Sequence, residues 1–162
     1  MTEKTSLLAS QLGELLLQRK LKVTCVESCT GGGVASAITD IPGSSAWFEY
    51  GFVTYANRAK QQLVGVSEQV LCAHGAVSEP VVREMVAGAL RVSGADIAVA
   101  ISGIAGPDGG TTDKPVGTVW FCWQEKMERA HCAREIFSGG RAEVRSAAVE
   151  RALQGLLDIL KK

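Results

Sequence analysis

The chain has 162 residues, of which 46% are hydrophobic and 21% charged, and its seventeen basic and seventeen acidic side chains cancel to a formal net charge of zero. This composition is typical of one folded domain, here residues 1–162, and excludes a disordered segment. The lack of a basic surplus argues against a nucleic-acid partner.

No apolar run approaches the roughly 18 residues that a membrane span needs. The amino terminus also lacks the long apolar core and the small-residue cleavage site of a signal peptide. We therefore expect a cytoplasmic protein with no membrane partner.

The first part of the chain predicts alternating helices and strands. Leucines recur at helical spacing over residues 5–19, which predicts an amphipathic helix. Valine and threonine over 22–27 predict a strand, and the glycines of 29–33 predict a turn. The expected elements after that turn are a helix over 34–39, a strand over 51–55 and a helix over 57–64.

The second part predicts capped helices, a buried strand and a hairpin. Ser67 and Ser78 stand where helix N-caps are expected, and the second of these helices runs to about Val92, where Gly94 fits its end. The apolar run over 97–102 suits a strand buried on both faces. A long loop over 103–115, hairpin strands over 116–124 and 129–137, and a helix over 141–160 complete the chain.

This order of elements predicts an α/β layered domain whose sheet is mostly parallel with at least one antiparallel strand. Ligands bind such sheets at the carboxyl ends of the strands. The turns at Ser28, Gly103 and Ser138 are therefore expected to share one edge.

The five cysteines are scattered and odd in number, which without a signal peptide predicts reduced thiols. Neither histidine is paired with cysteines, so a structural zinc site is not expected. A catalytic mechanism in this chain is expected to work without a histidine base. The cysteines are Cys25, Cys29, Cys72, Cys122 and Cys132.

The segment from Glu27 to Gly33 combines a strand end, glycines and a helix start. Backbone N–H groups at such a turn can hold an anion or a developing oxyanion, although an ordinary tight turn fits equally well. A helix N-terminus would lower the pKa of Cys29, but without a histidine partner a small, partly buried thiol is the favoured interpretation. Neither common nucleotide-binding glycine motif is present.

A second candidate group consists of Ser45, Tyr55 and Lys60. A serine becomes nucleophilic when a base lies close to it, and lysine can serve if burial lowers its pKa. The common short serine-hydrolase motifs are absent. The alternative is a turn serine, a strand tyrosine and a solvated lysine.

Two further segments could bind ligands. The glycine-rich segment Ser102–Gly110 leaves the buried strand, where loops hold ligands but are also merely flexible. Arg141 and Arg145 share a face at the start of the last helix, where they reinforce the positive end of its dipole. Phosphate suits such arginines, and a solvated charged face is the alternative.

Taken in order, six blocks of this sequence resemble the CinA C-terminal domain family, the nicotinamide-nucleotide amidohydrolases. The resemblance extends from about residue 5 to 160. The blocks are ESCTGG at 27–32, GSS at 43–45, GFVTY at 51–55, HGAVS at 74–78, SGIAGPDGG at 102–110 and KPVGTV at 114–119.

The resemblance implies a three-layer α/β/α fold with a mixed five-stranded sheet and a homo-oligomer, most simply a dimer. It implies hydrolysis of the carboxamide of nicotinamide mononucleotide to nicotinate mononucleotide and ammonia, with no metal or organic cofactor. Ser45 would be the nucleophile, and Tyr55 and Lys60 would handle its proton. The implied substrate-binding residues are Ser28, Thr30, Gly31, Ser102, Gly103, Ala105, Gly106, Arg141 and Arg145.

Two positions depart from the family pattern. Gly140 replaces an acidic residue that is common before the last helix, and Tyr50 replaces what is often glycine or arginine. Because both were expected beside the pocket, a relative that binds a pyridine nucleotide without turnover is the alternative function, and Ser28 is the alternative nucleophile. A purely structural or partner-binding domain is a third possibility.

Overall fold

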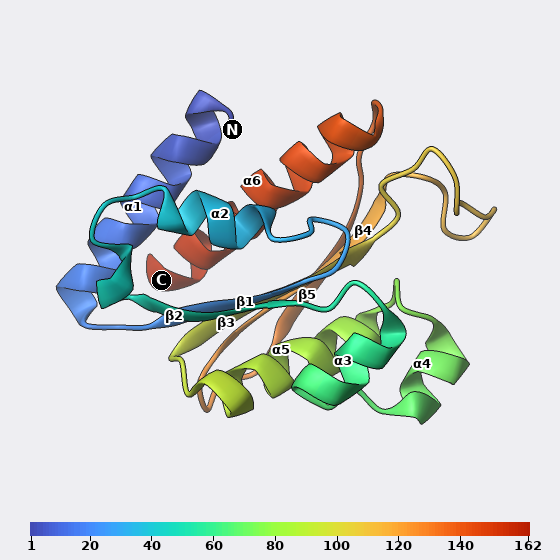
Figure 1. The fold of residues 1–162 in the computed structure, drawn as a ribbon, viewed down its shortest axis with the longest axis horizontal. Coiled ribbons are helices and arrows are strands. Elements are labelled where there is room, and N and C mark those ends of the chain that lie inside the picture. Colours follow the sequence, from blue (N-terminus) through green and yellow to red (C-terminus); the bar gives the residue numbers. More distant parts are fainter.

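The computed structural model describes all 162 residues. A central sheet lies between two layers of helices (Figure 1), which confirms the predicted three-layer α/β class. The helices are α1 (Glu3–Arg19), α2 (Gly33–Thr39), α3 (Asn57–Val64), α4 (Glu68–His74), α5 (Glu79–Ser93) and α6 (Arg141–Leu160), with a short 3-10 helix η1 (Ser44–Ala46). The strands are β1 (Val23–Glu27), β2 (Phe48–Val53), β3 (Ile97–Gly103), β4 (Thr118–Glu125) and β5 (His131–Ile136).

The sheet has the strand order β2-β1-β3-β4-β5. Strands β2, β1 and β3 are parallel, β4 is antiparallel to β3, and β5 is antiparallel to β4. Only β4 therefore runs against the other four strands, as predicted. The carboxyl ends of β1, β2 and β3 meet at one edge, and the loops that follow them are brought together there.

Each face of the sheet has its own core and its own helices. Helices α1, α2 and α6 cover one face, and α3, α4 and α5 cover the other (Figure 1). Strands β1 and β3 are buried on both faces, so their side chains alternate between the two cores. Cys25 thus belongs to the α6-side core, and its neighbour Val26 belongs to the α5-side core.

The helix ends agree better with the sequence prediction than the start of strand β2 does. The Ser67 hydroxyl accepts a hydrogen bond from the N–H of Val70, whereas the Ser78 hydroxyl makes no cap bond and donates to the carbonyl of Gly75. Strand β2 begins at Phe48, three residues before the predicted start. The reason is pairing with β1, since Phe48 lies opposite Val23.

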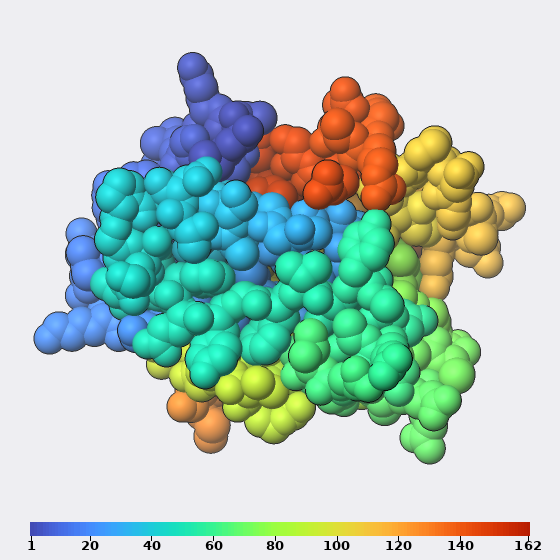
Figure 2. Space-filling model, viewed as in Figure 1, coloured from blue at the N-terminus to red at the C-terminus, as the bar shows by residue number.

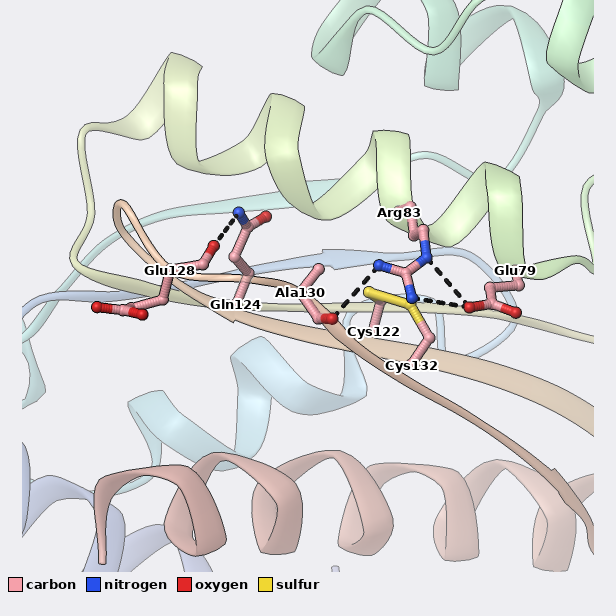
Figure 3. Close-up of a disulfide and its surroundings, with 7 residues drawn as sticks. All are labelled: Glu79, Arg83, Cys122, Gln124, Glu128, Ala130 and Cys132. Carbon is pink, nitrogen blue, oxygen red and sulfur yellow. Dashed lines mark hydrogen bonds and ion pairs between the residues drawn. A yellow bond between two sulfur atoms is a disulfide. The ribbon is translucent and has the colours of Figure 1, made fainter. Parts of the chain in front are cut away.

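The prediction of five reduced thiols is wrong for one pair. Cys122 on β4 and Cys132 on β5 form a disulfide, with their Cα atoms 4.1 Å apart (Figure 3). The hairpin register places the two residues directly opposite each other. The positions of the cysteines in the sequence did not indicate this pairing. Arg83 of α5 lies over this part of the hairpin and donates to the carbonyl of Ala130. Cys25, Cys29 and Cys72 are free thiols.

A carboxylate holds the turn between β1 and α2 in place. Glu27 is fully buried, and its two side-chain oxygens accept hydrogen bonds from the N–H groups of Val34 and Ala35 at 2.9 and 3.0 Å. The Thr30 hydroxyl donates to the same carboxylate at 2.6 Å. Glu27 therefore caps the N-terminus of α2, and the N–H groups that were expected to hold an external anion are partly occupied by the protein itself.

We expect replacement of Glu27 to destabilise the fold much more than replacement of a surface carboxylate does. Glu27→Ala leaves three buried or half-buried donors without an acceptor, at a cost of about 3 kcal/mol in the free energy of unfolding. The measurement is chemical denaturation of the variant and the wild type. Glu49→Ala is the matched control, because Glu49 forms only an exposed ion pair with Lys22 and should cost less than about 1 kcal/mol. Equal losses in the two variants would contradict the capping role.

Candidate active site

The carboxyl end of β1 brings a serine and a buried lysine into contact. Ser28 follows Glu27 directly, so its side chain points to the opposite face of the sheet, toward α3. There the Nζ of Lys60 donates to the Ser28 Oγ at 3.0 Å and to the carbonyl of Thr54 at 2.8 Å. Lys60 is only 1% exposed, and Ser28 is 8% exposed. This is the spacing that a nucleophile and its base require.

The surroundings of Lys60 favour its neutral form. Burial lowers the pKa of Lys60 from its ordinary 10.5 to about 8, with a smaller opposing effect from Cys29. No carboxylate pairs with Lys60, so no ion pair restores its charged form. A substantial share of Lys60 is therefore neutral near physiological pH, which an exposed lysine is not.

The turn after Ser28 presents unpaired backbone donors. The Ser28 N–H is bound to the carbonyl of Ile101, and the Gly31 N–H is bound to the carbonyl of Ser28. By contrast, the N–H groups of Cys29 and Thr30 have no hydrogen-bond acceptor in the protein, although both residues are buried. Successive unpaired N–H groups beside a nucleophile form a binding site for a developing oxyanion.

The environment of Cys29 does not favour a thiolate. The residue is 5% exposed, and burial raises the pKa of the Cys29 thiol to about 11, against smaller lowering effects of its backbone N–H and of Arg145. A buried thiol agrees with the interpretation favoured from the sequence.

The side chains of two arginines at the start of α6 reach the same edge of the sheet. The Nη1 of Arg141 donates to the carbonyl of Gly106 at 2.8 Å, and its Nη2 donates to the Tyr55 hydroxyl at 3.0 Å. Figure 2 shows the start of α6 in contact with the segment after β2 and beside the loop that follows β3. Arg145 donates to the carbonyls of Cys29 and Thr30, each at 3.1 Å. Neither arginine forms an ion pair.

The loop after β3 lies beside the serine. Ile101 is opposite Glu27 in the parallel register, so Ser102 is next to Ser28 at the sheet edge. Gly103 is required for close packing, because a Cβ there would meet the backbone oxygen of Thr118 at 2.9 Å. Ala105 and Gly106 continue the loop toward Arg141. The structure thus gathers the predicted substrate-binding residues at one edge: Ser28, Thr30, Gly31, Ser102, Gly103, Ala105, Gly106, Arg141 and Arg145.

The structure does not bring Ser45 to this group within one chain. Ser45 lies in η1, before the first residue of β2, and is exposed. Lys60 lies beyond the other end of β2, whose six residues span about 17 Å. The predicted trio of Ser45, Tyr55 and Lys60 is therefore not assembled here, because its first member precedes the strand that the other two follow.

Tyr55 lies at the rim of the site. Its side chain is 61% exposed, and its hydroxyl accepts from Arg141. No hydrogen bond joins it to Lys60 or Ser28, so the geometry does not support a proton relay through its phenol.

The two departures from the family pattern lie in different places. Gly140 is the N-cap of α6 and provides no side-chain cap, next to Arg141. Tyr50 lies in the middle of β2 and stacks on Phe52, with ring centroids 6.2 Å apart. Tyr50 therefore lies away from the candidate site, which is built at the carboxyl end of that strand.

Sequence reasoning gave no role to Glu27, although it is in the first of the six blocks. A signal was available, namely a carboxylate at a strand end directly before a short turn and a helix start.

The structure contains no group of three side chains that could hold a metal ion. None of its helices combines the length and the apolar character needed to cross a bilayer.

Comparisons with known proteins show the family to which the chain belongs. The family model described as the CinA C-terminal domain matches residues 5–160. A relative from Escherichia coli strain K12, named nicotinamide-nucleotide amidohydrolase PncC, is 59% identical over 149 residues, which are 92% of this chain and 90% of the relative. A relative of the same name from Pseudomonas putida is 53% identical over 152 residues, 94% of each chain.

Solved structures show the same fold. The competence/damage inducible protein CihA from Agrobacterium tumefaciens superposes with a TM-score of 0.96 at 39% identity and covers 100% of this chain and 98% of its own. A CinA superfamily protein from Klebsiella pneumoniae has a TM-score of 0.93 at 39% identity and covers 97% and 98%. With the family model spanning nearly its whole length, this chain belongs to the CinA C-terminal domain family.

Proposed function

We propose that this protein hydrolyses the carboxamide of nicotinamide mononucleotide to nicotinate mononucleotide and ammonia. The observation that carries the proposal is the contact between the buried Lys60 amine and the Ser28 hydroxyl, beside the unpaired N–H groups of Cys29 and Thr30. The family and the names of the relatives supply the substrate. The intact serine–lysine pair favours turnover over binding alone.

Attack on the carboxamide begins at Ser28. The neutral Lys60 amine takes the hydroxyl proton while the Ser28 oxygen bonds to the carboxamide carbon. The carbonyl oxygen becomes an oxyanion, which the N–H groups of Cys29 and Thr30 stabilise at about 3 kcal/mol for each well-placed donor. In the neutral amine, one proton stays bonded to the carbonyl of Thr54, and the lone pair accepts the proton of the Ser28 hydroxyl, 3.0 Å away.

The acyl-enzyme forms and breaks by the same groups. The carbon–nitrogen bond breaks, the Lys60 ammonium returns its proton to the leaving nitrogen, and ammonia departs. Water then attacks the Ser28 ester and gives one proton to Lys60, which passes it to the Ser28 oxygen as the ester bond breaks. The acid product loses its remaining proton to solvent and leaves as the carboxylate.

Arg141 is the proposed ligand of the substrate phosphate. Its guanidinium has no carboxylate partner, and its two hydrogen bonds go to a phenol and a carbonyl, which are weaker acceptors than a phosphate dianion. Tyr55, which Arg141 contacts, is assigned to substrate binding at the same rim.

The proposal also includes a homodimer, as the family resemblance implies, and a cytoplasmic location, as expected from the sequence. The edge strand β2 exposes apolar side chains, Tyr50 at 49% and Val53 at 48%, which is a surface suited to contact with a second copy. The zero net charge gives no reason to add a nucleic acid as a partner.

The nucleophile is tested by removing each serine in turn. We expect Ser28→Ala to lower kcat for ammonia release at least about 10³-fold, because the attacking oxygen is lost. Ser45→Ala is the matched control and should remain within about twofold of the wild type. Loss of activity in Ser45→Ala, with Ser28→Ala still active, would reverse the assignment.

The pH dependence tests the base. Lysine loses its proton as pH rises, so kcat/KM should increase about tenfold per pH unit below 8 and level off above it. His74→Ala and His131→Ala should keep the same midpoint. A midpoint near pH 6.5 that disappears with either histidine would contradict a lysine base.

The phosphate ligand is tested by substrate binding. Arg141→Ala should raise KM for the mononucleotide about 10- to 100-fold and change kcat less than about threefold. Hydrolysis of the same nucleoside without its phosphate should be unaffected. Arg134→Ala, on the far strand β5, is the control. An unchanged KM in Arg141→Ala would remove this role.

A further inference from the structure

We infer that Arg145 is a positioning residue that orients and polarises the oxyanion-binding turn, and that it is not a ligand of the substrate phosphate. The inference rests on the proposed function. It assigns the two arginines of α6, which share one helix face, to different tasks.

The first observation is what Arg145 contacts. Its Nε donates to the carbonyl of Cys29 and its Nη2 to the carbonyl of Thr30, both at 3.1 Å. The guanidinium therefore bridges two successive peptide units of the turn. Arg141 touches neither unit, since its bonds go to Gly106 and Tyr55.

The second observation is what lies at the other end of those peptide units. In a trans peptide the C=O and N–H groups point in opposite directions. The Cys29 carbonyl shares its peptide unit with the Thr30 N–H, which has no acceptor in the protein. With its carbonyl held by Arg145, this N–H points away from the guanidinium, and we infer that it faces the α3 side, where Ser28 meets Lys60.

The second unit closes the turn. The Thr30 carbonyl shares its peptide unit with the Gly31 N–H, which donates to the carbonyl of Ser28 at 3.0 Å. Gly31 has a φ of +57°, and a Cβ there would lie 3.4 Å from Arg145. Arg145 thus packs directly on the turn and fixes both the peptide that carries the free donor and the peptide that anchors Ser28.

The positive charge of Arg145 also acts on the turn. Arg145 has no ion-pair partner, so its full positive charge acts on the two carbonyls. A cation on a carbonyl oxygen polarises the peptide and makes its N–H a stronger donor. The Thr30 N–H is therefore strengthened toward an oxyanion, whose charge exists only in the transition state and the tetrahedral intermediate.

The kinetic test separates positioning from phosphate binding. We expect Arg145→Ala to lower kcat for the mononucleotide about 10- to 100-fold with KM within about threefold of the wild type. Arg145→Lys, which can charge one carbonyl but not bridge two, should recover part of the loss, and Arg145→Gln should recover less. The same fold-loss is expected on the nucleoside that lacks the phosphate. A rise in KM larger than the fall in kcat, or wild-type kinetics, would overturn the inference.

A second measurement does not depend on turnover. In the ligand-free protein, the amide proton shift of Thr30, followed by NMR, should change more in Arg145→Lys than in Arg141→Lys. An unchanged Thr30 amide would overturn the inference. Failure of the proposed function is distinguishable, because it would appear as a wild-type protein that releases no ammonia while the Thr30 amide still responds to Arg145.

Discussion

The buried carboxylate of Glu27 is the contact on which the site depends. It ends β1, caps α2 and binds the Thr30 hydroxyl, so a five-residue turn is held at both ends by one side chain. Without that cap, the N–H groups at the start of α2 would need other acceptors inside the protein. With it, the turn has one conformation, and the N–H groups left unpaired are those next to Ser28.

Because side chains alternate along β1, the residues of the site lie on both faces of the sheet. Glu27 points into the α6-side layer and its neighbour Ser28 points toward α3. Structural contacts to the turn, from Glu27 and Arg145, therefore come from one side, and the base Lys60 comes from the other. This separation allows a buried lysine to remain without a counter-charge, since the Glu27 carboxylate points to the other face of the sheet. The same burial that disfavours its protonated form makes it a base.

The fold could be predicted from sequence because its signals are local. Leucine spacing in α1, the apolar run of β3 and the cap at Ser67 each depend on a few adjacent residues. The start of β2 could not be predicted in this way, because pairing with Val23, far away in the chain, decides it. The disulfide was missed for the same reason, since only the hairpin register places Cys122 opposite Cys132.

The sequence predicted which residues lie at the site better than it predicted which of them contact one another. Lys60, Ser28 and the α6 arginines are all at the predicted edge, because they follow strand ends or begin a helix there. The family resemblance favoured Ser45 as the partner of Lys60 and left Ser28 as the alternative. Only the parallel pairing of β1 with β2 shows that Ser28, which is farther from Lys60 in sequence, lies beside it in space. The role of Arg145 depends on which peptide carbonyls it reaches, and no residue pattern encodes that.

The most direct measurement is an NMR titration of the lysine side chains in the ligand-free protein. If Lys60 is the base for Ser28, one lysine titrates near pH 8, its signal is absent from Lys60→Met, and its midpoint moves in Ser28→Ala. A Lys60 signal that titrates near 10.4, the ordinary pKa of a lysine side chain, would contradict the serine–lysine mechanism.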